Sequence, residues 1–179
     1  MLIGKRVILR GLELTDVDEL MKYWNREEVK EFLMIFSPHA KEEEIEWIKK
    51  TWEMRKKGDA YIFGIVNSEK DLYIGNIELR IISQISRRGM IGLVIFNPEY
   101  WDKGFGTEAL KLIINYGFKN LNLYSIELEV FETNLRAQTC YRKVGFKEVG
   151  RRRKAQFYKG TYIDSIIMDI ISSEWLGEA

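Results

Sequence analysis

Two residue types that often build functional sites are almost absent from this sequence. The 179 residues include one cysteine, Cys140, and one histidine, His39. A single cysteine excludes a disulfide within the chain, so we expect a reducing, intracellular setting. One cysteine and one histidine cannot assemble a typical zinc ligand set, so we expect no metal.

Long apolar runs and an excess of one charge are also missing. No run of about 18 apolar residues is present for a membrane span, and no charged-then-apolar leader begins the sequence. Lys and Arg number 28 against 27 Asp and Glu, so no overall field points to nucleic acid or membrane as a partner. We therefore expect a cytoplasmic protein. Its 46% apolar content predicts one domain over residues 1–179, in which residues 172–179 could form a loose tail.

Hydrophobic periodicity predicts alternating strands and helices. Helical spacing covers residues 16–24, with Thr15-Asp16 as the expected N-cap, and 26–33, 41–57, 107–118 and 134–144. Extended patterns cover residues 1–10, 60–67, 72–85, 91–96 and 121–131 and a closing hairpin around Lys159-Gly160. This order predicts an α/β (α+β) fold: a mixed central sheet of about seven strands with helices on both faces. The strand at 91 and the strand at 121 should be parallel.

A strand, a glycine-containing turn and a helix N-terminus follow one another in residues 91–110, IGLVIFNPEYWDKGFGTEAL. The unpaired N–H groups of a first helical turn favour an anion, and Gly104 and Gly106 would let the backbone approach a diphosphate. The same pattern also fits a helix that packs tightly on a sheet. The turn matches neither the dinucleotide fingerprint nor the Walker loop.

A second pattern covers residues 134–146 and reads N-x-x-[SA]-x-x-x-Y-x-K-x-G-F. Asn134 and Tyr141 are seven residues apart, so they lie on one helix face. Together with the glycine turn upstream, this pattern resembles the GNAT superfamily of acyl-CoA-dependent N-acetyltransferases. The resemblance covers nearly the whole chain. It is most similar to the branch that contains ribosomal-protein N-terminal acetyltransferases and spermidine acetyltransferases.

The resemblance implies that acetyl-CoA is the cosubstrate, and it assigns binding residues. The backbone of Val94, Ile95 and Phe96 would pair with the pantetheine arm like an added strand. Asn134 would hydrogen-bond that arm, and Lys143 would meet a CoA phosphate. The CoA diphosphate would be held by backbone amides of Asp102, Lys103, Gly104, Phe105, Gly106 and Thr107. The chain departs from the family at Trp101, where Gln or Arg is commoner, and at Ala137, where Ser is commoner.

Tyr141 is the general acid that the resemblance implies. The acceptor amine attacks the thioester carbonyl directly, and a well-placed tyrosine can protonate the leaving thiolate. The structural alternatives are a tyrosine that only packs its helix on the sheet and, for Asn134, a helix N-cap compatible with cofactor binding. Glu78 is the candidate base, acting through water. Its alternative is a place in a solvated strand stripe with Asn76 and Arg80.

The sequence narrows the acceptor less than the cofactor. The spermidine branch usually carries acids at positions that here are approximately Ile82 and Ile91, which disfavours a polyamine. We expect a protein N-terminal amine or another small primary amine, with a polyamine as the alternative and a non-catalytic acyl-CoA-binding module as a further one. The loop from Met34 to Ala40, which carries Phe36, should help to form the acceptor's entrance.

Three other features receive structural interpretations. Cys140 points about 100° away from Tyr141 on a helix, and direct amine attack needs no cysteine nucleophile. The basic run 151–154 lacks interleaved aromatics, so a hydrated strand is expected rather than a nucleic-acid site. The apolar closing strand, 163–171, could leave an edge for a homodimer or pack in the monomer core.

Overall fold

One eight-stranded mixed sheet is the frame of the molecule, whose computed structural model describes residues 1–33 and 37–177. The strand order is β1-β2-β3-β4-β5-β6-β8-β7. Neighbouring strands run antiparallel, except that β5 and β6 are parallel, as predicted. The strands are β1 (Leu2–Ile3), β2 (Val7–Arg10), β3 (Ala60–Asn67), β4 (Leu72–Ser83), β5 (Arg88–Ile95), β6 (Ser125–Phe131), β7 (Lys147–Tyr158) and β8 (Thr161–Ile171).

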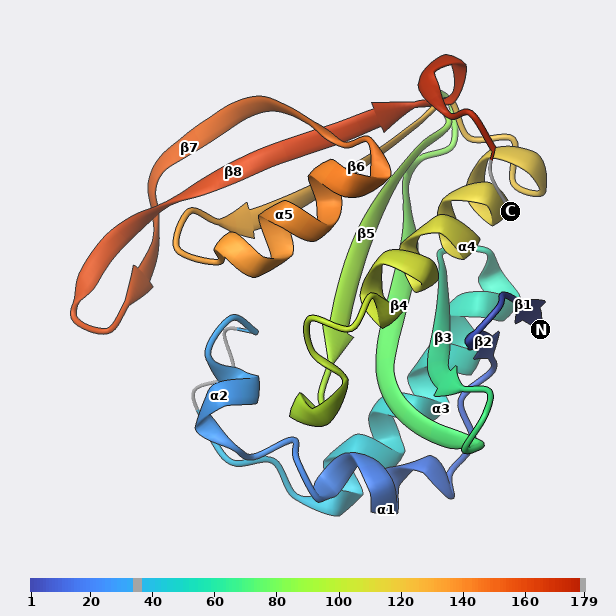
Figure 1. Ribbon diagram of the computed structural model, residues 1–179, viewed down its shortest axis with the longest axis vertical. Helices are drawn as coiled ribbons and strands as arrows, with labels where there is room; N and C mark the ends of the chain where they lie inside the picture. Colours follow the sequence, from blue (N-terminus) through green and yellow to red (C-terminus); the bar gives the residue numbers. More distant parts are fainter. Residues whose placement is uncertain (34–36, 178–179) are drawn as a thin grey trace.

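Helices cover both faces of this sheet, which confirms the predicted α/β architecture (Figure 1). On one face lie α4 (Phe105–Lys119) and α5 (Leu135–Val144). On the other lie α1 (Asp16–Met21), α2 (Glu27–Lys30) and α3 (Lys41–Lys57). Each face has its own apolar core, because each helix presents one apolar stripe to the strands. Among the described residues, no helix has the length and apolar character needed to cross a bilayer.

The first strand differs from the prediction, and this difference gives eight strands instead of seven. Residues 1–10 break into β1 and β2 at Gly4, whose N–H donates to Val7 O at 2.8 Å. Glu108, in the first turn of α4, accepts the backbone N–H groups of Arg6 at 2.7 Å and Val7 at 3.1 Å. A Cβ on Gly4 would lie 2.6 Å from the same carboxylate. The break therefore depends on a residue far along the sequence.

Thr15 is the N-cap residue of α1, as predicted, but its side chain makes no capping hydrogen bond. Asp16 secures this end of the helix instead. Its buried carboxylate accepts two hydrogen bonds from Arg10, at 2.8 and 2.7 Å, and one from Glu13 N at 2.8 Å. A buried carboxylate needs such partners, and they hold α1 against the end of β2.

Residues 172–175, which follow β8, contact the rest of the domain. Residues Ser172–Glu174 form a 3-10 turn, Glu174 forms an ion pair with Lys147, and Trp175 packs on the larger core cluster. In β8, Ile166, Met168 and Ile170 are buried, so this strand contributes to the monomer core, and β7 forms the edge of the sheet.

The parallel pair β5–β6 separates soon after it forms. Only three residue pairs join the two strands, from Arg88↔Ser125 to Met90↔Glu127. From Ile91 to Ile95, β5 continues to pair with β4 but has no partner on its other edge within the described chain. Figure 1 shows the β6-β8-β7 half of the sheet turning away from the other half. The resulting gap positions the site.

Candidate active site

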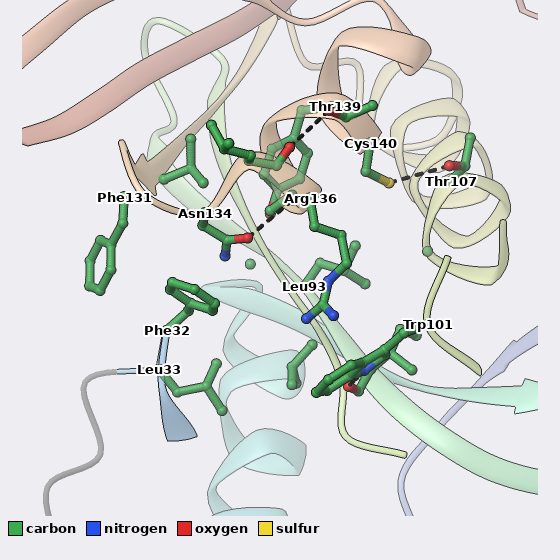
Figure 2. A pocket seen from close by; sticks show the side chains of 18 of the residues that line it. Phe32, Leu33, Leu93, Trp101, Thr107, Phe131, Asn134, Arg136, Thr139 and Cys140 are labelled. Carbon is green, nitrogen blue, oxygen red and sulfur yellow. Dashed lines mark hydrogen bonds between the residues drawn. The ribbon is translucent and has the colours of Figure 1, made fainter. Parts of the chain in front are cut away.

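A cavity of about 800 Å³ occupies the gap between β5 and β6. Its wall combines the free edge of β5, the turn into α4, one side of α5, the end of β6 and the α2 region, by which we mean residues 27–33 (Figure 2). These segments come from both faces of the sheet. The cavity therefore passes through the sheet at the point where the strands separate.

Some of the predicted site residues line this cavity and others do not. Those in its wall are Val94, Ile95, Asp102, Gly104, Gly106, Thr107, Asn134, Tyr141 and Lys143. Four others do not line it: Glu78, Phe96, Lys103 and Phe105. Phe96 is fully buried against Tyr73, with 4.8 Å between ring centroids, and Phe105 packs against Tyr100 at 5.1 Å. The part of the entrance loop at residues 34–36 lies outside the described residues.

The turn into α4 presents unpaired backbone donors. Gly104 is the N-cap in the left-handed region, with φ of 86°, and Asp102 also has a positive φ of 57°. The first hydrogen bond of the helix runs from Glu108 N to Gly104 O at 3.0 Å. The N–H groups of residues 105–107 thus find no carbonyl among the described residues, which makes this end of α4 suited to an anion.

Arg6 brings a positive charge to the same turn, although no sequence pattern indicated this. Its guanidinium lies over the Phe105 ring at 4.9 Å, donates to Lys103 O at 3.1 Å and contacts Glu108 at 3.4 Å. The only sequence signal was an arginine in a strand. Its place at the turn depends on the contact between β2 and α4, which sequence spacing does not reveal.

The free edge of β5 carries a different set of backbone groups from the predicted one. Phe96 N donates to Ile74 O of β4 at 3.1 Å, so the backbone polar groups of Phe96 face β4. Alternate residues of a strand direct these groups to opposite edges, so Leu93 and Ile95 direct theirs to the cavity edge, and Val94 does not. Trp101 agrees with this assignment, since its Nε1 donates to Ile95 O at 2.6 Å from that side.

Trp101 also contacts a second arginine at the cavity. The Arg136 guanidinium lies over the indole, 3.9 Å from the ring centroid, and Figure 2 shows its side chain extending into the cavity from α5. Because Trp101 already occupies the Ile95 carbonyl, the Leu93 groups and the Ile95 N–H are the backbone groups that residues 92–95 leave free at this edge.

The α5 helix supplies the two polar side chains of the second sequence pattern. Asn134 Oδ1 caps the helix by accepting from Ala137 N at 3.1 Å, and its amide nitrogen turns toward the cavity (Figure 2). Tyr141 is buried, with its ring against Phe146 at 5.9 Å, and it lines the cavity. Burial, with a smaller contribution from Cys140, raises the pKa of Tyr141 well above its usual range. The phenol therefore remains a proton donor at neutral pH.

Cys140 and His39 each make a structural contact, and for Cys140 this agrees with the expected non-catalytic role. Cys140 Sγ lies 3.3 Å from Thr107 Oγ1 and so joins α5 to α4, and burial raises the pKa of its thiol. An uncharged thiol is a weak nucleophile. His39 Nδ1 lies 2.6 Å from Glu44 Oε1, outside the cavity wall.

Glu78 stands next to the cavity without lining it. Its carboxylate pairs with Arg80, at 2.7 Å, in the polar stripe that the sequence suggested as its alternative role. Its Cα partner across the β4–β5 pair is Gly92, which does line the cavity. Directly opposed residues of an antiparallel pair share a face, so Glu78 faces the α1–α3 side beside this glycine.

The wall on the α1–α3 side is mainly apolar, and the sequence did not predict it. Val29, Phe32 and Leu33 from the α2 region lie across the cavity from Phe131 of β6. The two sides meet at Phe32, whose ring centroid is 6.3 Å from that of Phe131.

An ion pair fixes the α2 region to the β7–β8 hairpin. Glu31 accepts a hydrogen bond from Lys159 Nζ at 2.7 Å and another from the Tyr158 hydroxyl. The first of these, more than the second, lowers the pKa of Glu31. Tyr158 also stacks on Phe32 at 6.3 Å. These contacts hold the apolar wall in place.

Comparisons with known proteins agree with this geometry. A family model described as "Acetyltransferase (GNAT) domain" matches residues 6–147. An uncharacterized N-acetyltransferase, p20 of Bacillus licheniformis, is 31% identical over 98% of both chains. The crystal structure of spermidine N-acetyltransferase from Vibrio cholerae with CoA and spermine superposes with a TM-score of 0.85, at 26% identity, over 97% of this chain and 99% of the other. Mycobacterium smegmatis RimJ in complex with CoA-disulfide has the same fold, with a TM-score of 0.86 at 19% identity, over 97% and 85% of the two chains.

Proposed function

Since this chain belongs to the GNAT acetyltransferase family, we propose that it transfers the acetyl group of acetyl-CoA to a protein N-terminal amine. The observation that carries this proposal is one continuous cavity. It joins the free N–H groups of α4, the free edge of β5 and the buried Tyr141 side chain, and it extends through the sheet to an apolar wall. We expect the protein to act in the cytoplasm.

The cofactor half of the cavity matches the parts of CoA in order. The N–H groups of residues 105–107 suit the diphosphate, with Arg6 and Lys143 as nearby cations. The Leu93 backbone, the Ile95 N–H and the Asn134 amide suit the amide groups of the pantetheine arm. The thioester would then lie near Tyr141, at the opening through the sheet.

The proposed reaction is a direct transfer. The neutral amine attacks the thioester carbonyl carbon, and the carbon–sulfur bond breaks as the tetrahedral intermediate collapses. The Tyr141 hydroxyl gives its proton to the departing sulfur, because burial keeps the phenol protonated. The amine gives up a proton through water toward Glu78, and no covalent enzyme intermediate forms.

A Glu78→Gln variant tests whether Glu78 is the general base. We expect kcat/KM for the acceptor to fall by about 100-fold, because the amide cannot take the proton from the attacking amine. The alkaline rise of the pH–rate profile should remain, since free amine then forms without a base. Arg80→Gln is the matched control. It breaks the same exposed ion pair, worth about 0–1 kcal/mol, and should keep near-normal activity. Equal, small effects of both variants would leave Glu78 as a surface partner only.

A polyamine is the second candidate acceptor, and one observation favours it. The Vibrio cholerae protein that is similar over nearly the whole chain is a spermidine N-acetyltransferase whose structure contains spermine. The apolar wall of Val29, Phe32, Leu33 and Phe131 argues for the N-terminal amine, because a peptide places an apolar backbone and side chain beside one ammonium.

Thiol release from acetyl-CoA, with mass detection of the product, decides between these functions. The acceptor panel contains peptides with free and blocked N-termini, spermidine and small primary amines. We expect free N-terminal peptides to be acetylated with the highest kcat/KM, and blocked peptides to be inert. Preference for spermidine would establish the polyamine function. CoA binding without any acetylated acceptor would identify a binding module and overturn the proposal.

A further inference from the structure

We infer that the acceptor amine binds over Gly92, that Glu129 holds its ammonium group, and that the acceptor carries a single positive charge beside an apolar group. This inference rests on the proposed acetyl transfer and names the class of amine. It concerns the half of the cavity on the α1–α3 face of the sheet, where the two diverging strands leave room for a ligand.

Gly92 provides the space. It shares its face of β5 with Val94, which packs in the core on the α1–α3 side. A Cβ built on Gly92 would meet no atom within 4 Å, although this residue lies in the middle of a strand and lines the cavity. Any larger residue would project into this space, so the glycine leaves a recess in the sheet surface.

Glu129 stands on the other side of this recess. The parallel register pairs Met90 with Glu127. Continued by two residues along the diverging strands, it places Gly92 opposite Glu129 on the same face. Glu78 flanks Gly92 on its other side as the Cα partner in β4. The recess thus lies between two carboxylate-bearing strands, with the proposed base on one and Glu129 on the other.

One oxygen of Glu129 has no partner. Oε2 accepts from Arg152 Nη1 at 2.8 Å, whereas Oε1 is buried without a hydrogen bond to any described residue. A buried carboxylate oxygen in the wall of a cavity needs a donor, and leaving it unpaired costs free energy. An ammonium group supplies three N–H donors, so it can donate one hydrogen bond to this oxygen while it lies in the recess.

The charges around the recess favour an acceptor with one ammonium group over an acceptor with two or more. Of the other acids near this wall, Glu31 is already occupied by Lys159 and Tyr158, and the exposed Glu28 shares a neighbouring hollow with Arg136. Arg136 extends into the cavity over Trp101 and would repel a second cation. The remaining surface near Glu129 is apolar and comes from Val29, Phe32, Leu33 and Phe131. A second ammonium would lose water here without gaining a second unpaired buried carboxylate oxygen.

Gly92→Ala is the direct steric test, because the added methyl enters open space and should not disturb the fold. We expect the acceptor KM, measured with n-butylamine and with an N-terminal peptide, to rise about tenfold or more, the effect of one misplaced methyl group in a binding pocket. CoA affinity and melting temperature should not change. Gly150→Ala is the matched control, a strand glycine of β7 whose added Cβ also meets nothing within 4 Å.

Glu129→Gln tests the ammonium contact. We expect a tenfold or greater rise in acceptor KM, because a hydrogen bond to a charged group is worth about 1.5–3 kcal/mol, and only a small change in kcat. Glu127→Gln is the control. It lies two residues away on the same face of β6, also pairs with an arginine, Arg88, and does not line the cavity. It should behave like the wild-type protein.

The charge of the acceptor is tested with n-butylamine and putrescine, which have the same carbon chain but one and two amines. We expect kcat/KM to be higher for n-butylamine by about tenfold or more, because the second ammonium would lose water beside the apolar wall and would be repelled by Arg136. A preference for putrescine, or normal acceptor KM in both Gly92→Ala and Glu129→Gln, would overturn the inference while leaving acetyl transfer intact. Failure to acetylate any amine would overturn the proposed function itself.

Discussion

Replacing Tyr141 by phenylalanine is expected to lower kcat by about 1,000-fold, within the usual range for loss of a general acid. CoA affinity should stay within about twofold, because the ring keeps its apolar contacts. Stopped-flow thiol release gives the first quantity and calorimetric titration with CoA gives the second. A large loss of kcat with unchanged CoA affinity is the result expected of a general acid.

The structure explains why this substitution isolates the oxygen atom. The Tyr141 ring packs on Phe146, a contact that phenylalanine preserves. The hydroxyl has no hydrogen-bond partner in the part of the chain that is described, so its removal leaves no buried group unpaired. Because burial raises the pKa of this phenol, its ionisation should not lower the rate near its ordinary pKa of about 10.

Tyr116→Phe is a suitable control for Tyr141→Phe. Tyr116 lies on α4, packs edge-on against Tyr61 and Phe63, and is not part of the cavity wall. It should retain wild-type turnover. Parallel losses of kcat and CoA affinity in Tyr141→Phe would instead mean that the tyrosine only supports the packing of α5.

The second large effect is expected from Gly106→Val, which should weaken CoA binding by about 1,000-fold. Two or more hydrogen bonds to the charged diphosphate would be blocked, each worth about 1.5–3 kcal/mol. Gly106 lines the cavity in the first turn of α4, and a Cβ there would lie 3.3 Å from Leu93 Cδ2 and 3.7 Å from Cys140 Sγ. The two extra methyl groups of valine then have to occupy cofactor space.

Gly106→Ala provides the graded comparison. Its single Cβ approaches the flexible end of the Leu93 side chain, which can shift by a few tenths of an ångström, so a much smaller loss is expected. Melting temperatures of both variants separate local blockage from unfolding. Normal CoA affinity in a folded Gly106→Val protein would place the diphosphate elsewhere.

The sequence predicted the fold class and several residues that line the cavity because both are encoded locally. Asn134 and Tyr141 share a helix face at a fixed spacing, and Gly104 and Gly106 lie in one short turn. The sequence could not reveal which edge of β5 lacks a partner. That edge depends on where β6 separates, and so the prediction named Val94 and Phe96, whereas Leu93 and Ile95 direct their backbone groups to the cavity.

The remaining parts of the site depend on contacts between distant segments. Arg6 reaches the α4 turn through the carboxylate of Glu108, and no periodicity connects these two residues. The recess at Gly92 can be interpreted as an acceptor site only because Glu129, a residue of the next strand in the sheet, lies beside it. An isolated strand glycine and an isolated strand glutamate look ordinary in a sequence.

The passage of the cavity through the sheet has a kinetic consequence. Its wall includes the α4 turn on one face and the α2 region on the other, so the proposed function gives each cosubstrate its own entrance. Neither molecule must pass the other to reach the gap between β5 and β6, and the two products can depart on separate routes. The architecture therefore suits a ternary complex with no obligatory order of arrival.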